Sequence, residues 1–310
     1  MSTPYLRLAA LAAHALFAAF SATLPAQTAH PTLSHFSLSS GCGKAPASTG
    51  QSKIETKDGR GFTRTYLMLV PKAYDPHKTY SLAFVFHGSG GTSEASMSWG
   101  LQNAPGAAES AIFLFPQGVA YHNSPAGWDD TPSGYDMPFF DALVSSVEDA
   151  YCIDRDEVFV AGFSWGGDFA IALSCARGDA IRAVAVNSAG DEFKNKADAG
   201  TYRYSPCASR IHPAVRFQHA VNGDSAYSVQ EFTTASQFFA KQNQCNGGSK
   251  PAPSSASQIS CRVFAGCAQG YTECPFDAGI GHALPPNWPQ DTWEFFASFR
   301  EKDRDVSHYR

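Results

Sequence analysis

Ser164 is the residue whose surroundings most clearly predict chemistry. It lies in the pattern Gly162-Phe-Ser-Trp-Gly166, between a strand-like run, Val158–Ala161, and a helix-like run that begins at Trp165. A serine on a sharp strand-to-helix turn projects its hydroxyl into a site, and flanking glycines avoid collisions with the sheet and the helix. Free N–H groups at the helix N-terminus favour negative charge that develops there. We therefore predict that Ser164 is the nucleophile of an acyl-transfer reaction.

The glycine-rich segment Phe84–Gly91, with the sequence FVFHGSGG, is the second such feature. A loop of this kind supplies one backbone N–H of an oxyanion hole, and the residue after the nucleophile supplies the other. We assign these roles to Ser89 and Trp165. His87 precedes Ser164 in the chain, so we expect it to hold the loop in shape rather than to act as the base.

An acid and a base should follow the nucleophile, in that order. The strand-like run Val215–Val221 leads into Asp224, which is the leading candidate for the acid, and Asp191 is the alternative. His282 lies in the glycine-flanked loop AGIGHA and is the only histidine between Asp224 and the last predicted helix. We predict that His282 accepts the Ser164 proton and that Asp224 orients the imidazole ring.

Strand-like and helix-like segments alternate along the chain and must position these residues. Apolar or alternating runs predict strands at Thr63–Val70, Leu82–Phe86, Ala111–Phe115, Val158–Ala161, Ala183–Val186, Val215–Val221 and Ile259–Phe264. Helical spacing predicts helices at Asp136–Ala150, Trp165–Ala176, Val229–Lys241 and Asp291–Arg300. Asp136 could cap the first of these helices. The alternation predicts a single α/β domain, with a mostly parallel sheet covered by helices on both faces.

Two polar stretches interrupt this pattern, Asp191–Arg210 and Asn246–Ser257. Either could border a substrate cleft, the first as a lid, or be a plain surface loop. No Pro/Ser-rich linker is long enough to divide the chain into two domains.

The N-terminal residues have the pattern of a secretory signal peptide. Arg7 precedes an apolar run from Leu8 to Leu24, and small residues follow around Ala26 and Ala29. A membrane anchor is the alternative, but polar residues interrupt the run and no second spanning segment follows. We predict a signal peptide at residues 1–29, a mature domain at residues 30–310 and a secreted protein without a membrane span.

Eight cysteines agree with export, because disulfides persist in oxidising compartments. They are Cys42, Cys152, Cys175, Cys207, Cys245, Cys261, Cys267 and Cys274. We expect disulfides, with Cys175, in a predicted helix, as the best candidate for an unpaired buried thiol. The pairing cannot be deduced from the spacing.

Charge and motifs exclude several classes of ligand. The net charge is −5 and 16% of the residues are charged, so no basic face for nucleic acid is expected. The loop at Phe84–Gly91 lacks the G-K-[ST] ending and the GxGxxG spacing of phosphate-binding loops. No Cys/His spacing suggests zinc. We expect no nucleotide, metal or redox cofactor; the oligomeric state cannot be deduced from the sequence.

Taken together, these stretches resemble the secreted feruloyl esterases of carbohydrate esterase family 1, type D in particular, and the related extracellular polyhydroxybutyrate depolymerase-like esterases. The matching motifs are Gly41–Pro46, Phe115–Gly118, Gly127–Trp128, Cys152–Asp154, Gly162–Gly167, Cys261, Gly266–Cys267, Cys274–Asp277 and Gly281–His282. The resemblance implies an α/β-hydrolase fold, a Ser/Asp/His triad and ester substrates on plant cell-wall polysaccharide. The segment around Asp224 is longer than in relatives, and Asp168, just after the glycines of the elbow, departs from their pattern.

Aromatic residues could form an acyl pocket, since flat rings stack on a phenolic acid. Trp165 is the first candidate because it follows the nucleophile; Trp128 is the second, and Tyr121 could also contribute. The leading hypothesis is a feruloyl or hydroxycinnamoyl esterase. The alternatives are an acetylxylan esterase, a polyester depolymerase, and a non-catalytic wall-binding protein on a hydrolase scaffold.

Overall fold

The computed structural model describes residues 38–131, 133–190, 207, 209–222, 224–254, 259–277, 279 and 281–300. The predicted signal peptide, the alternative acid Asp191 and most of the segment Asp191–Arg210 lie outside these residues. Phe36–Arg310 forms one compact unit. Within the described ranges, no helix has the length and apolar character needed to cross a membrane.

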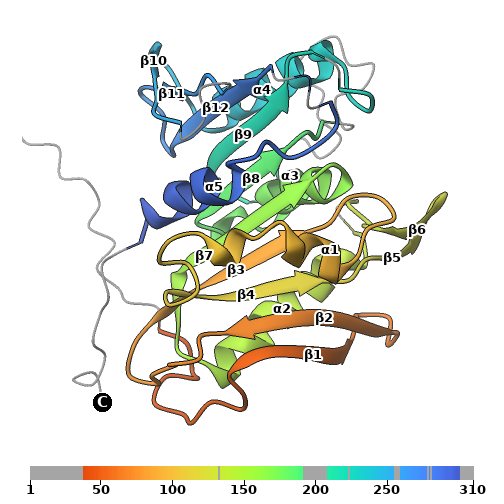
Figure 1. Ribbon diagram of the computed structural model, residues 1–310, viewed down its shortest axis with the longest axis vertical. Helices are drawn as coiled ribbons and strands as arrows, with labels where there is room; N and C mark the ends of the chain where they lie inside the picture. The colour runs from red at the N-terminus through yellow and green to blue at the C-terminus, as the bar shows by residue number, and fades with distance from the viewer. Residues whose placement is uncertain are drawn as a thin grey trace, which may run out of the picture. The chain divides into compact units, whose positions relative to one another are not determined.

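A ten-stranded sheet lies at the centre of this unit (Figure 1). In spatial order its strands are β1 (Gly50–Lys57), β2 (Thr63–Val70), β4 (Ala111–Pro116), β3 (Tyr80–Phe86), β7 (Ile153–Phe163), β8 (Ala183–Asn187), β9 (Ala214–Ala220), β12 (Tyr271–Phe276), β11 (Arg262–Phe264) and β10 (Ser249–Pro251). The strands from β4 to β12 pair in parallel. The pairs at both edges are antiparallel. The predicted, mostly parallel α/β sheet is confirmed.

Helices cover both faces of the sheet because the central strands are apolar on both sides. The helices are α1 (Ser93–Ser98), α2 (Asp136–Ala150), α3 (Trp165–Ala176), α4 (Val229–Gln242) and α5 (Trp288–Ala297). In β3, Phe84 packs in a core cluster with α2, α3 and α4, whereas its neighbour Val85 packs in a second cluster with α5. Figure 1 shows α5 crossing the opposite face from α2, α3 and α4. A short hairpin, β5 (Val119–Tyr121) and β6 (Ser124–Gly127), lies outside the sheet.

Three predicted elements need correction. Asp136 does not cap α2 but is its first residue, where its carboxylate is used by other partners. Helix α5 begins earlier than predicted, at Trp288, because a proline in the first turn of a helix lacks only an N–H that would be unpaired anyway. Of the strand predicted at Ile259–Phe264, only Arg262–Phe264 forms β11, while Ile259 makes an isolated bridge to Phe276.

The strands β1 and β12 have no counterpart in the sequence prediction. Strand β1 alternates between half-buried and exposed residues at the sheet edge, so its apolar signal is weak. Strand β12 carries Cys274 and Pro275, which hide its strand pattern, yet it pairs in parallel with β9. This omission matters because β12 leads the chain directly towards His282.

Four disulfides use every cysteine of the chain, which confirms the disulfide prediction. The pairs are Cys42–Cys152, Cys175–Cys207, Cys245–Cys267 and Cys261–Cys274. The expectation that Cys175 is an unpaired thiol is wrong, because its partner Cys207 lies beside the end of α3. Two of the four pairs lie near β11 and β12: Cys261–Cys274 joins β12 to the residue before β11, and Cys245–Cys267 joins the segment after α4 to the segment after β11.

Candidate active site

Ser164 occupies the turn between β7 and α3 with a positive φ of 56°, a conformation that costs energy for a residue with a side chain. The close packing around this turn requires the glycines. A methyl group on Gly162 would lie 2.1 Å from the Gly166 carbonyl oxygen, and one on Gly166 would lie 2.2 Å from the Phe86 oxygen. The turn therefore holds the Ser164 hydroxyl at the carboxyl end of the sheet.

The structure brings the three residues predicted as a triad together. His282 Nε2 lies 2.9 Å from Ser164 Oγ. On the other side of the ring, His282 Nδ1 lies 3.2 Å from Asp224 Oδ1 and 3.3 Å from Oδ2. The Asp224 side chain is 2% exposed, and its Oδ1 accepts backbone N–H groups of Ala226 at 2.8 Å and Tyr227 at 3.0 Å. These donors stabilise a carboxylate that faces the imidazole.

The two residues predicted for the oxyanion hole lie on either side of Ser164. Trp165 is the first residue of α3, so its N–H has no partner within the helix. The loop after β3 approaches so closely that a methyl group on Gly88 would lie 3.0 Å from Ser164 Cβ. In that loop Gly90 N–H donates to Ala126 O, and the described chain contains no acceptor bonded to the Ser89 N–H.

His87 is fully buried beneath this loop and does not contact Ser164. Its Nδ1 lies 2.7 Å from Gly88 O, and its Nε2 accepts the Gly118 N–H at 2.9 Å. A ring that donates from Nδ1 and accepts at Nε2 is neutral. Burial lowers the pKa of His87 below its ordinary value, which keeps that form. These contacts match the predicted structural role.

The chain resembles known esterases over most of its length. No profile of a known protein family matches the chain. Feruloyl esterase C of Emericella nidulans is 33% identical over 279 residues, which cover 84% of this chain and 92% of that protein. Feruloyl esterase D of Neurospora crassa is 28% identical over 292 residues, which cover 88% of this chain and 94% of that protein. The chain belongs to the feruloyl esterase family. The resemblance seen in its motifs is confirmed, and the protein is a carboxylic ester hydrolase.

Solved structures show the fold of this esterase. An acetyl xylan esterase from Aspergillus awamori superimposes with a TM-score of 0.63 at 14% identity, covering 80% of this chain and 100% of that one. A ferulic acid esterase superimposes with a TM-score of 0.56 at 16% identity, covering 81% and 98%. The predicted α/β-hydrolase fold is confirmed.

A pocket of about 330 Å³ opens beside Ser164 in the esterase. Its lining residues are Ser89, His122, Asp130, Ser164, Trp165, Asp168 and Tyr227. Sequence reasoning found the two serines and Trp165. His122 and Tyr227 carried no motif, and Asp130 was not singled out. Asp168 was noted only as a departure from the family pattern, which was the one available signal.

Trp128, the second residue predicted to bind substrate, lies in the core. Its side chain is fully buried and does not line the pocket. The indole ring stacks on Phe169 at a centroid distance of 5.4 Å, and its Nε1 donates to His87 O at 2.8 Å. Trp128 therefore supports the loop that follows β3 from within the core. Tyr121 packs against the Trp165 ring at 5.8 Å and donates to Asp129 Oδ1.

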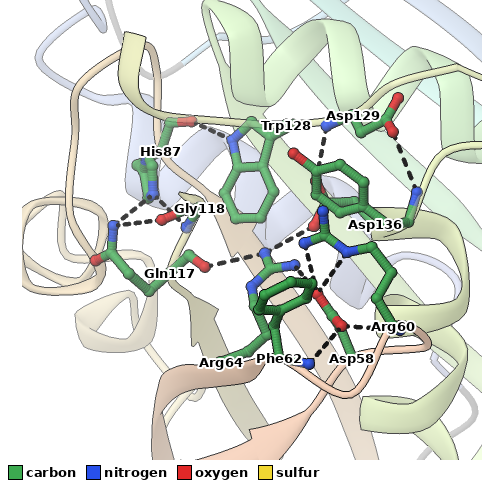
Figure 2. Close-up of polar contacts among 11 residues, drawn as sticks. Asp58, Arg60, Phe62, Arg64, His87, Gln117, Gly118, Trp128, Asp129 and Asp136 are labelled. Carbon is green, nitrogen blue, oxygen red and sulfur yellow. Dashed lines mark hydrogen bonds and ion pairs between the residues drawn. The ribbon is translucent and has the colours of Figure 1, made fainter. Parts of the chain in front are cut away.

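A buried charge cluster supports the same loop from below, and no sequence motif predicted it (Figure 2). Arg64, in β2, is fully buried; its Nη1 lies 3.5 Å from Asp58 and its Nη2 2.7 Å from Asp136. Arg64 Nη2 also donates to the Gln117 carbonyl oxygen at 3.2 Å. The Gln117 side chain in turn donates to Gly91 O and Gly118 O. The cluster thus ties β2 and α2 to the segments that hold His87.

Proposed function

We propose that this esterase hydrolyses feruloyl and related hydroxycinnamoyl esters of plant cell-wall polysaccharide. The observation that carries the proposal is the hydrogen-bonded pair of Ser164 and His282, which lies beside the half-buried Trp165 ring in the pocket. The names of the curated relatives, feruloyl esterase C and D, supply the substrate class.

The proposed mechanism has Ser164, His282 and Asp224 as the catalytic triad. The Ser164 proton moves to His282 Nε2 while Oγ attacks the ester carbonyl, and Asp224 stabilises the imidazolium that forms. The N–H groups of Ser89 and Trp165 stabilise the tetrahedral oxyanion. His282 then protonates the sugar oxygen as its bond to the carbonyl carbon breaks, which releases the sugar hydroxyl and leaves a feruloyl ester on Ser164. Water, deprotonated by His282, hydrolyses this acyl-enzyme and releases ferulate.

A substrate profile tests this function. We expect release of ferulate from methyl ferulate and from feruloylated arabinoxylan, with kcat/KM on methyl ferulate exceeding that on methyl acetate. Liquid chromatography of the released acids measures both reactions. Activity on acetylated xylan without ferulate release would favour an acetylxylan esterase. Clearing of polyhydroxybutyrate films without ferulate release would favour the depolymerase alternative.

Replacement of the Trp165 side chain tests the aromatic part of the pocket. Trp165→Leu retains the backbone N–H and removes the indole, which we propose stacks on the feruloyl ring. Because aromatic pairs contribute about 0.5–1.5 kcal/mol beyond their buried area, we expect KM for methyl ferulate to rise about three- to tenfold. Activity on p-nitrophenyl acetate should change little.

Phe62→Leu is the matched control for this substitution, because Phe62 is a 62% exposed aromatic residue that does not line the pocket. The ratio of kcat/KM on methyl ferulate to kcat/KM on p-nitrophenyl acetate should fall in Trp165→Leu and stay unchanged in Phe62→Leu. Equal losses on both esters would contradict a stacking role for the indole.

We further propose that the esterase is secreted by means of a signal peptide at residues 1–29 and functions as a single domain at residues 30–310. Four disulfides and the lack of a membrane-spanning helix in the described ranges are consistent with an extracellular protein. N-terminal sequencing of the protein exported by a fungal host tests the cleavage.

A further inference from the structure

Asp168 is a buried carboxylate that the proposed mechanism does not use. It lies in the first turn of α3, and its N–H donates to Ser164 O at 3.0 Å. The side chain is almost fully buried. Its Oδ1 accepts the Gly190 N–H at 2.7 Å, and its Oδ2 accepts the Tyr227 hydroxyl at 2.7 Å. Asp168 therefore joins the helix behind Ser164 to the segments that follow β8 and β9.

Tyr227 links Asp168 to the acid and the base. Its backbone N–H donates to Asp224 Oδ1, and its ring lies 5.5 Å from the His282 ring between centroids. The described residues of the loop between β9 and α4, which carries Asp224, form no helix or strand. At one end Val221 N–H donates to Phe276 O, and at the other Ser228 caps α4. The Tyr227 hydroxyl anchors the α4 end of this loop to the helix that follows Ser164.

We infer that the Asp168–Tyr227 hydrogen bond is a positioning element that holds Asp224 against His282. This inference rests on the proposed triad. Asp224 and Ser164 belong to different connections of the sheet, and among the described residues both His282 and the Asp168–Tyr227 hydrogen bond join these connections. A loop that moves by about 1 Å at Asp224 would misorient the imidazole, and misplacement of that size costs up to about 100-fold in rate.

Tyr227→Phe tests the inference because it removes one oxygen atom and keeps the ring against His282. We expect kcat for methyl ferulate to fall about tenfold or more, while KM stays within about twofold. The acid limb of the kcat/KM profile should move to lower pH, because a carboxylate held less firmly stabilises the imidazolium less. The variant keeps the Asp168 charge, so loss of that charge cannot cause the shift.

Asp168→Asn is the second variant, and it retains only one of the two acceptor oxygens. If the two residues act through one hydrogen bond, the Asp168→Asn/Tyr227→Phe double variant should lose no more activity than the more impaired of the two single variants. Tyr271→Phe is the matched control. It removes another buried tyrosine hydroxyl, bonded to Ser236 at 2.8 Å away from the pocket, and should leave kcat and the pH profile unchanged.

The results that would overturn the inference differ from those that would overturn the function. An unchanged kcat and pH profile in Tyr227→Phe, or a rise in KM alone, would show that the link does not position Asp224. If the unsubstituted esterase hydrolyses p-nitrophenyl acetate but not methyl ferulate, the substrate proposal fails and the same profiles are measured on the acetate. If it hydrolyses neither ester, the rate at which a fluorophosphonate labels Ser164 is measured across pH in the unsubstituted esterase and in Tyr227→Phe, and this rate is compared instead of kcat.

Discussion

Ser164→Ala is expected to lower kcat on methyl ferulate by at least about 10⁴-fold, because loss of a triad nucleophile leaves only binding and oxyanion contacts. The substitution removes one oxygen atom. The backbone around Gly162 and Gly166 is closely packed, so the turn should keep its conformation. The fold and the thermal midpoint should therefore change little. Initial rates at high enzyme concentration and a fluorophosphonate probe measure the effect; the variant should not be labelled.

Ser174→Ala is the matched control, since this serine is buried in the same helix and donates to Ile171 O outside the site. It should retain activity and labelling. A folded, unsubstituted esterase that neither reacts with the probe nor hydrolyses esters would favour the non-catalytic wall-binding alternative.

Comparison of Asp224→Asn with Asp191→Asn identifies the acid of the triad. We expect kcat to fall by about 10⁴-fold in Asp224→Asn and to stay unchanged in Asp191→Asn.

Arg64→Met is expected to destabilise the folded state by about 3–5 kcal/mol, because it removes one partner of a buried ion pair. Asp136 would be left without its cation. Burial already raises the pKa of this carboxyl, and the charge of Arg64 is what opposes that effect. The Gln117 carbonyl would also lose its donor, so the oxyanion loop should loosen. Guanidinium unfolding curves with the disulfides intact measure the change in free energy.

Arg177→Met controls for loss of an arginine from a well-formed pair. Arg177 pairs with Asp141 through two hydrogen bonds, but both side chains are substantially exposed, and such pairs contribute at most about 1 kcal/mol. Restoring partial stability in the Arg64→Met/Asp136→Asn double variant would identify the unpaired carboxylate as the cause. Equal unfolding free energies for Arg64→Met and Arg177→Met would contradict the role of the cluster.

Local sequence determined the elements that surround the nucleophile. A strand segment that is buried on both faces is continuously apolar, and for that reason the runs Leu82–Phe86 of β3 and Val158–Ala161 of β7 were recognisable. The glycines around Ser164 form a local motif, although the backbone contacts that require them are local for Gly162, which approaches Gly166, and distant for Gly166, which approaches Phe86 in β3. His282 was found by elimination, because one histidine follows Asp224 before the last helix.

Other features depend on contacts that no local pattern records. Trp165 and Trp128 are the first and second candidates for the pocket in the sequence; Trp165 lines the pocket, whereas Trp128 is fully buried. The difference arises because the Trp128 indole finds an acceptor in His87 O, which belongs to a segment 41 residues away. Arg64 likewise has no distinguishing pattern in the sequence, and only the structure shows that it pairs with Asp58 and Asp136.

The sequence by itself determined the glycine-flanked turn that carries Ser164, the alternation of strands and helices, and the family. Only the tertiary structure decided how Asp224 is held, which cysteines pair and which aromatic ring faces the pocket. The physical reason is the strand order, in which β8 and β9 separate β7 from β12. That order brings Asp168, Tyr227 and His282 together from three connections, whereas the residues around Ser164 meet within a single turn of chain.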